Sequence, residues 1–206
     1  MNRVIFLIDG FNLYHSLIDD RNHFPSRYKW LDLSKLAKCF ITKKDSIVDI
    51  LYFTAYTVWD DQKVSRHKKY IRALESKKVK TILGSYRPVR RKCRGSCKEV
   101  YPTYEEKQTD VNIAITLFEL ACKDKFDTAN IISADSDLFP AIKLVKKDFP
   151  RKKVNVIFPK RRYSESLRQI ADVRINIKEH HIKSSLFDNQ ITVAKNVVLQ
   201  CPDEWK

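Results

Sequence analysis

The chain has 206 residues, with 40 Lys and Arg against 25 Asp and Glu, so its formal net charge is +15. A chain of this length can bury one sizeable core, and it contains no run of roughly 18 apolar residues that could form a membrane-spanning helix. We therefore expect one globular domain with elaborations and no membrane partner. The surplus of cations, spread along the chain, favours a nucleic acid as partner over a role in solubility alone.

The cysteines and the start of the chain indicate where the protein works. There are five cysteines, an odd number, and the first residues lack the pattern of a signal peptide. These features favour a reducing, cytoplasmic setting over a disulfide framework. Cys93 and Cys97 supply at most half of a tetrahedral zinc site, so we do not expect Zn²⁺ there unless a homodimer pools two such pairs.

Short apolar runs alternate with helix-length segments. The expected strands are residues 4–8, 47–53, 79–83, 129–132, 154–158 and 173–177. The expected helical segments are a turn at 13–18 and helices at 31–41, 62–76, 105–123, 138–147 and 165–170. This alternation predicts an α/β fold, with a mainly parallel central sheet of about five or six strands and helices on both faces. Neither glycine-rich phosphate-binding motif is present, which excludes dinucleotide-binding and P-loop enzymes.

A basic segment interrupts this alternation before the helix expected at 105–123. Residues 86–103 are rich in Arg and Lys around two cysteines, and we expect them to form a loop-like insertion. The alternation ends after residue 177. We therefore assign residues 1–178 to the domain and residues 179–206 to a C-terminal extension that wraps around it.

Acidic side chains follow two of the expected strands. Asp9 ends the first strand and is followed by Gly10 and Asn12, whose side-chain amide can turn back toward it. Asp135 and Asp137 follow the fourth strand. Parallel sheets place their ligand sites beyond the carboxyl ends of the strands, so we expect these three carboxylates at one edge of the sheet.

Asp110 adds a fourth carboxylate at the start of a helix. It shares one helical face with two alanines and a leucine, so we expect it to point inward. Buried acids close to one another are costly unless a cation compensates them, and an all-oxygen site suits Mg²⁺ or Mn²⁺. Each acid alone has a plain structural alternative: a helix N-cap for Asp137, helix-start electrostatics for Asp110 and a turn for Asp9.

Five motifs, in this order, resemble the NYN domain family of PIN-like nucleases, which includes the LabA-like bacterial proteins. They are residues 6–15 (FLIDGFNLYH), 29–33 (KWLDL), 52–55 (YFTA), 106–112 (EKQTDVN) and 132–137 (ISADSD). The similarity covers nearly the whole chain, including residues 201–205. It implies a PIN-like Rossmannoid fold and the activity of a Mg²⁺-dependent endoribonuclease. Only the resemblance favours RNA over DNA.

The resemblance also implies roles for individual residues. The matching positions are metal-binding Asp9, Asp110, Asp135 and Asp137, with Asn12 and Ser133 in support. We expect Asp9, Asp110 and Asp135 to contact the cation directly, and Asp137 to act through water or a second ion. Glu106, one helical turn before Asp110, is a further candidate. The corresponding hypothesis is metal-assisted phosphodiester hydrolysis by an activated water.

Cations and tyrosines beside an acidic pocket can hold the backbone and stack the bases of single-stranded RNA. The candidates are Arg66, Lys69, Lys107, Arg161, Arg162 and Tyr163. We expect His15 to be a packing residue and not a general base. The alternative to a nuclease is an RNA-binding or regulatory protein that keeps the acidic pocket and catalyses little or nothing.

Overall fold

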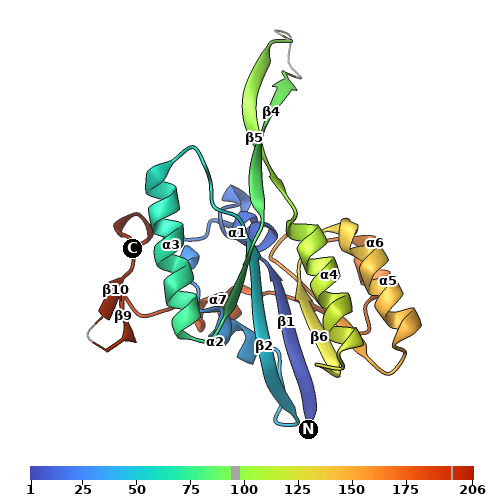
Figure 1. Ribbon diagram of the computed structural model, residues 1–206. Helices are drawn as coiled ribbons and strands as arrows, with labels where there is room; N and C mark the ends of the chain where they lie inside the picture. Colours follow the sequence, from blue (N-terminus) through green and yellow to red (C-terminus); the bar gives the residue numbers. More distant parts are fainter. Residues whose placement is uncertain (94–97, 196) are drawn as a thin grey trace.

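The computed structural model describes residues 1–93, 98–195 and 197–206. Its centre is a six-stranded sheet in the order β3-β2-β1-β6-β7-β8, and all neighbouring strands are parallel (Figure 1). These strands are β1 (Asn2–Asp9), β2 (Asp45–Thr54), β3 (Lys80–Leu83), β6 (Thr128–Ile132), β7 (Lys153–Phe158) and β8 (Arg174–Asn176). The expected parallel α/β fold of PIN-like Rossmannoid type is confirmed.

Strand β1 lies in the middle of the sheet and is buried on both faces. Val4, Phe6 and Ile8 join one hydrophobic cluster, whereas Ile5 and Leu7 join the other. Full burial of such a side chain contributes about 1.5–3 kcal/mol. The apolar run of the sequence thus becomes the strand that anchors both halves of the core.

Helices cover both faces of the sheet (Figure 1). One face carries α1 (Gly10–Leu17), α2 (Leu33–Lys38), α3 (Asp61–Ser76) and α7 (Glu179–Lys183). The other carries α4 (Thr109–Cys122), α5 (Phe139–Asp148) and α6 (Glu165–Ile170). Short 3-10 turns are η1 (Asp20–Asn22), η2 (Ser26–Lys29) and η3 (Ser136–Leu138). In the described ranges, no helix is long and apolar enough to cross a membrane.

The basic insertion contains an antiparallel hairpin and not the loop that we expected. Strands β4 (Ser85–Lys92) and β5 (Val100–Lys107) pair and project beyond the edge of the sheet (Figure 1). The strands were hidden in the sequence because a projecting hairpin has no core-facing apolar run. The helix expected at 105–123 is also too long. Residues 105–107 belong to β5, and α4 begins after Gln108 takes a left-handed backbone with a φ of 79°.

The segment after β8 packs near α3. Trp30 Nε1 donates a hydrogen bond to the backbone carbonyl of Asp188 at 2.9 Å, and the Trp30 ring contacts the rings of Phe187 and Trp205. Strands β9 (Gln190–Ala194) and β10 (Val197–Gln200) pair antiparallel and precede η4 (Asp203–Trp205). The ring of Trp205 also lies 6.0 Å from that of Tyr70 on α3, so the C-terminal residues cover this part of the core.

Candidate active site

Asp9 lies at the carboxyl end of β1, where both of its carboxylate oxygens are held. Oδ1 accepts a hydrogen bond from the backbone N–H of Asn12 at 2.9 Å, and Oδ2 accepts one from the Ser133 hydroxyl at 2.7 Å. Asp9 is only 3% exposed, and its burial raises the pKa of this carboxyl although the two hydrogen bonds lower it. Gly10 is needed next, because a Cβ there would lie 2.6 Å from the Phe53 carbonyl oxygen.

The loop after β6 connects directly to Asp9. The Ser133 hydroxyl that donates to Asp9 also accepts the backbone N–H of Asp135 at 3.0 Å. Asp135 in turn caps η3, since its Oδ1 accepts the backbone N–H of Asp137 at 2.9 Å. The cap role considered for Asp137 therefore belongs to Asp135. Asp137 is left exposed. The side-chain oxygen of Asn12 accepts a hydrogen bond from the backbone N–H of Ala134 in the same loop at 3.3 Å.

Asp110 in the first turn of α4 and Glu106 on β5 approach the same place. Burial, followed by the negative charges of Asp135 and Asp9, raises the pKa of Asp110 to about 6. Burial, followed by the charges of Asp9 and Asp110, raises the pKa of Glu106 to about 7. Thr109 donates a hydrogen bond to Glu106. We name the whole group the carboxylate cluster: Asp9, Glu106, Asp110, Asp135 and Asp137.

The carboxylate cluster has the donor chemistry of a hard-cation site but not its closed spacing. Its oxygens are the ligands that Mg²⁺ and Mn²⁺ prefer, and the charges that raise the pKa of Asp110 are all negative. Within the described ranges, no three Asp, Glu, His or Cys side chains are placed so that they could hold a metal ion. Asp9 is held by two hydrogen bonds, so closure of the site would require Asp110 and Asp135 to rotate. Rotation of Asp135 would break its hydrogen bond with the N–H of Asp137.

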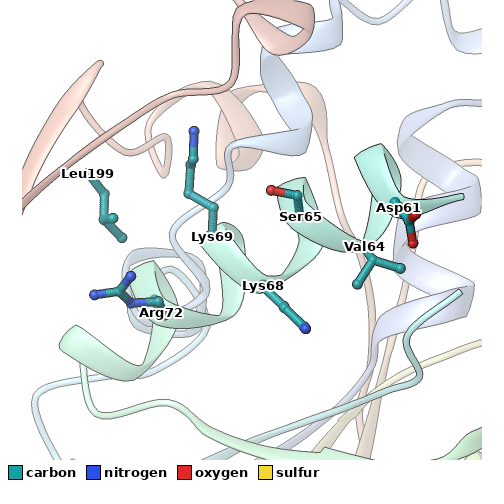
Figure 2. A pocket seen from close by; sticks show the side chains of 7 residues that line it. All are labelled: Asp61, Val64, Ser65, Lys68, Lys69, Arg72 and Leu199. Atoms are coloured by element: carbon teal, nitrogen blue, oxygen red, sulfur yellow. The ribbon is translucent and has the colours of Figure 1, made fainter.

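The basic residues considered on α3 line two different hollows. Arg66 forms an ion pair with Glu204 at 2.7 Å and lines a cavity close to α1. Lys69 lines a second hollow, of about 420 Å³, together with Arg72 and Leu199 (Figure 2). Arg66 and Lys69 are three residues apart on α3, but they line different hollows.

Lys107 does not share a face of the hairpin with Glu106. Successive side chains of a strand point to opposite faces, so Lys107 lies with Glu105 on the side away from Glu106. Lys107 Nζ and Arg91 Nη2 lie 2.9 and 2.6 Å from the Glu105 carboxylate. Hydrogen bonds from these two cations lower the pKa of Glu105 to about 2. A phosphate contact by Lys107 would have to compete with this ion pair.

The loop after β7 lies against the end of α1. Arg162 Nη2 donates a hydrogen bond to the backbone carbonyl of His15 at 3.2 Å. Burial, followed by the charge of Arg162, lowers the pKa of His15, and the His15 ring lies 4.2 Å from that of Phe11. These contacts are those of a packing residue. Arg161 and Tyr163, on either side of Arg162, are exposed.

The sequence did not reveal a cavity of about 570 Å³ that lies among α1, the loop after β2, α3 and the hairpin. Aromatic side chains form much of its lining, among them Phe11, Trp59, Tyr86 and Tyr104, and we call it the aromatic cavity. One signal was available. Trp59, Tyr86 and Tyr104 stand in polar segments that have no core-facing pattern, where aromatic residues need another explanation.

The expectation that Cys93 and Cys97 do not hold Zn²⁺ stays a prediction. Cys97 lies outside the described ranges. The backbone N–H of Cys93 donates to the carbonyl of Glu99 at 2.7 Å, which continues the pairing of the hairpin by one step.

Comparison with known proteins places this site in a family. A model of the NYN domain matches residues 3–178. The chain is 26% identical over 178 residues to the 6-hydroxy-3-succinoylpyridine 3-monooxygenase HspA of Pseudomonas putida, covering 70% of this chain and 55% of that protein. The chain thus spans about half the length of this curated relative.

A solved structure gives a likeness of fold alone. It is that of a protein of unknown function from Vibrio parahaemolyticus, and it matches with a TM-score of 0.59 at 19% sequence identity. The match covers 90% of this chain and 96% of that chain. Since the family model extends over most of the sequence, this chain belongs to the NYN domain family.

Proposed function

We propose that this chain is a Mg²⁺- or Mn²⁺-dependent nuclease that hydrolyses phosphodiester bonds in RNA. The observation that carries the proposal is the carboxylate cluster, in which Asp9, Asp110 and Asp135 reach one edge of the sheet from three separate elements. The mutual repulsion that raises the pKa of Asp110 to about 6 is what a bound cation would relieve. Membership in a PIN-like family and a net charge of +15 support a polyanionic substrate.

The residues of the cluster have distinct tasks in this proposal. Asp9, Asp110 and Asp135 would hold the cation, with the exposed Asp137 at its outer side. When bound, the cation lowers the pKa of a water ligand and neutralises charge that develops on the phosphate. The Ser133 hydroxyl contacts both the carboxylate of Asp9 and the backbone N–H of Asp135, so it links Asp9 to the loop that carries Asp135.

Glu106 is suited to moving a proton. A carboxyl group whose pKa lies near the working pH can take up or release a proton during a reaction, and the pKa of Glu106 is raised to about 7. The hydrogen bond from Thr109 orients its carboxylate. Glu106 reaches the cluster from β5 of the hairpin and not from the sheet.

The test is cleavage of labelled single-stranded RNA with Mn²⁺ or Mg²⁺, with and without EDTA, by the protein and by Asp135→Asn. An asparagine can still cap η3, so this variant should fold. The matched control is Asp148→Asn, which removes an exposed acid at the end of α5, away from the cluster. We expect EDTA and Asp135→Asn to abolish cleavage and the control to leave it unchanged.

Cleavage that is indifferent to both EDTA and Asp135→Asn would contradict the proposal. Tight RNA binding without any cleavage would favour the alternative, a catalytically silent RNA-binding protein. One observation favours this alternative: among the described residues, no three potential ligands are close enough to hold a metal ion.

A second candidate comes from the name of the Pseudomonas protein, a monooxygenase of a substituted pyridine. The aromatic cavity, at about 570 Å³, is of the size that small-molecule sites have. Oxidation of a pyridine requires O₂ and a reductant. Oxygen consumption with 6-hydroxy-3-succinoylpyridine and NADH, together with no RNA cleavage, would favour this candidate over the nuclease.

A further inference from the structure

The aromatic cavity lies next to the carboxylate cluster. Gly10 and Phe11, the two residues after Asp9, line it from the start of α1. On the other side, Tyr86 pairs with Glu106 across the hairpin, and paired residues of an antiparallel ladder point to the same face. Burial, followed by the charge of Glu106, raises the pKa of Tyr86 to about 12. A molecule in the cavity would therefore touch both walls next to the acids.

A stack of aromatic rings forms the outer wall of the cavity. Trp59 and Tyr104 lie nearly parallel, with ring centroids 4.3 Å apart and an interplanar angle of 15°. Tyr86 meets Trp59 edge-on at 5.0 Å. Trp59 nevertheless remains 44% exposed and Tyr104 37% exposed. Both rings therefore keep accessible surface that a planar ring can contact.

Uncharged polar groups line the inner part of the cavity. Within the described residues, the hydroxyl of Thr57 is buried and has no hydrogen-bond partner. His67 Nε2 lies 3.3 Å from the hydroxyl of Thr54, and burial lowers the pKa of His67 to about 4, so its imidazole is neutral at pH 7. Such groups can bind the edge of a heterocycle without an opposing charge.

Cations complete the lining. Lys29, Lys63 and Arg66 all border the cavity, and of these Arg66 is paired with Glu204 and Lys63 lies 3.4 Å from Asp60. The combination of a stacking platform, uncharged hydrogen-bonding groups and nearby cations is the chemistry by which proteins hold an unpaired base and its backbone.

We propose that the aromatic cavity binds one unstacked nucleobase of a single-stranded nucleic acid, with Trp59 as the stacking platform. The phosphate next to that base then lies toward the carboxylate cluster. The binding of the base stands on the cavity alone, whereas the position of the phosphate rests on the proposed nuclease function. A base that remains paired in a duplex cannot enter, so the cavity selects single strands.

The test measures binding in EDTA, so that no cleavage occurs. The probes are a short labelled single-stranded RNA and an abasic strand of the same length, followed by fluorescence anisotropy. The variants are Trp59→Ala, Trp59→Phe and Tyr101→Ala. Tyr101 is the matched control, because it is 48% exposed on the same strand as Tyr104 but points to the other face of the hairpin.

We expect Trp59→Ala to weaken binding of the RNA about tenfold and to leave binding of the abasic strand unchanged, since stacking acts on the base alone. Trp59→Phe keeps a stacking face and should retain most of the affinity. Tyr101→Ala should bind both probes as the unaltered protein does. Equal binding of RNA by Trp59→Ala and the unaltered protein, or an equal loss for both probes, would overturn the proposal.

Two further results separate this inference from the nuclease proposal. Base-dependent binding through Trp59 in a protein that never cleaves RNA would leave the cavity assignment standing and sink the nuclease. Metal-dependent cleavage that Trp59→Ala does not affect, with no preference in binding for RNA over the abasic strand, would support the nuclease proposal and overturn the cavity assignment. Binding of free 6-hydroxy-3-succinoylpyridine that depends on Trp59, without any effect of Trp59→Ala on RNA, would also overturn the base-binding proposal.

Discussion

The carboxyl edge of the sheet and the projecting hairpin meet at one site but are built in opposite ways. At the sheet edge, Asp9 is almost fully buried and held by two hydrogen bonds. On the hairpin, Glu106 and the tyrosines of the aromatic cavity extend from a two-stranded ladder outside the core. We therefore expect the sheet to fix the position of the acids and the hairpin to contact the substrate.

The largest expected effect is at the sheet edge, where one substitution should lower activity and raise stability. Asp110→Asn should lower the rate of RNA cleavage by at least about a hundredfold. Loss of a residue that only contacts a metal ligand already lowers activity by about 10- to 100-fold, and Asp110 is proposed to contact the cation itself. The same change removes a charge that Asp9 and Asp135 repel, so the metal-free protein should melt at a higher temperature at pH 7.5. Cleavage assays and thermal melts in EDTA measure both. A variant that is both active and less stable would break the comparison.

The second-largest effect should come from Ser133, which connects Asp9 and the backbone of Asp135 by hydrogen bonds. Ser133→Ala leaves Asp9 without one hydrogen bond and the Asp135 N–H without its acceptor. We expect activity to fall about 10- to 100-fold and the free energy of unfolding to fall by about 1–3 kcal/mol. Urea denaturation and cleavage rates test this. Ser136→Ala, an exposed neighbour in η3, should change neither, and equal losses in both variants would show that Ser133 has no special role.

A substitution in the hairpin should weaken RNA binding and leave stability almost unchanged. Tyr104→Ala removes an exposed ring outside the core, so the free energy of unfolding should change by no more than about 0.5 kcal/mol. Binding of single-stranded RNA should nevertheless weaken about fivefold through loss of the stack with Trp59. A large loss of stability with unchanged binding would mean that the stack serves the fold.

The smallest effect is a pH dependence of the metal-free protein. The folded pKa of Glu106, about 7, lies above its ordinary value of 4.5, so its contribution to stability is present at low pH and is lost as the pH rises through 7. Solvent exposure limits the change to a few tenths of a kcal/mol. His67, with a folded pKa of about 4, acts in the opposite sense only below pH 6.5.

Melting in EDTA between pH 6.5 and 8 tests Glu106, because the folded pKa of Asp110, about 6, places most of the effect of Asp110 below this range. We expect the melting temperature to fall slightly over this range in the unaltered protein and to stay level in Glu106→Gln. Saturating Mn²⁺ should raise the melting temperature by binding to the folded state. A melting temperature that rises with pH would contradict the assigned direction of the pKa shift.

The same contrast between sheet and hairpin explains what the sequence could predict. The four inner strands of the sheet are readable because burial on both faces leaves continuous apolar runs such as residues 4–8, whereas the edge strands β3 and β8 are only partly buried. Asp9 and Asp135 follow from the ends of those runs. The hairpin has no such run, and Glu106, which we considered as one helical turn before Asp110, lies on a strand. The contact of Trp59 with Tyr104 depends on how the hairpin folds over the loop after β2, and no local pattern encodes it.

A crystal structure of the protein soaked in Mn²⁺, with anomalous scattering recorded at the manganese edge, tests most directly whether the carboxylate cluster holds a cation. We predict a manganese peak at the carboxylate cluster, contacted by oxygens of Asp9, Asp110 and Asp135, with Asp110 and Asp135 turned toward Asp9. A structure at saturating Mn²⁺ with no peak among these side chains would contradict the claim that they share a cation.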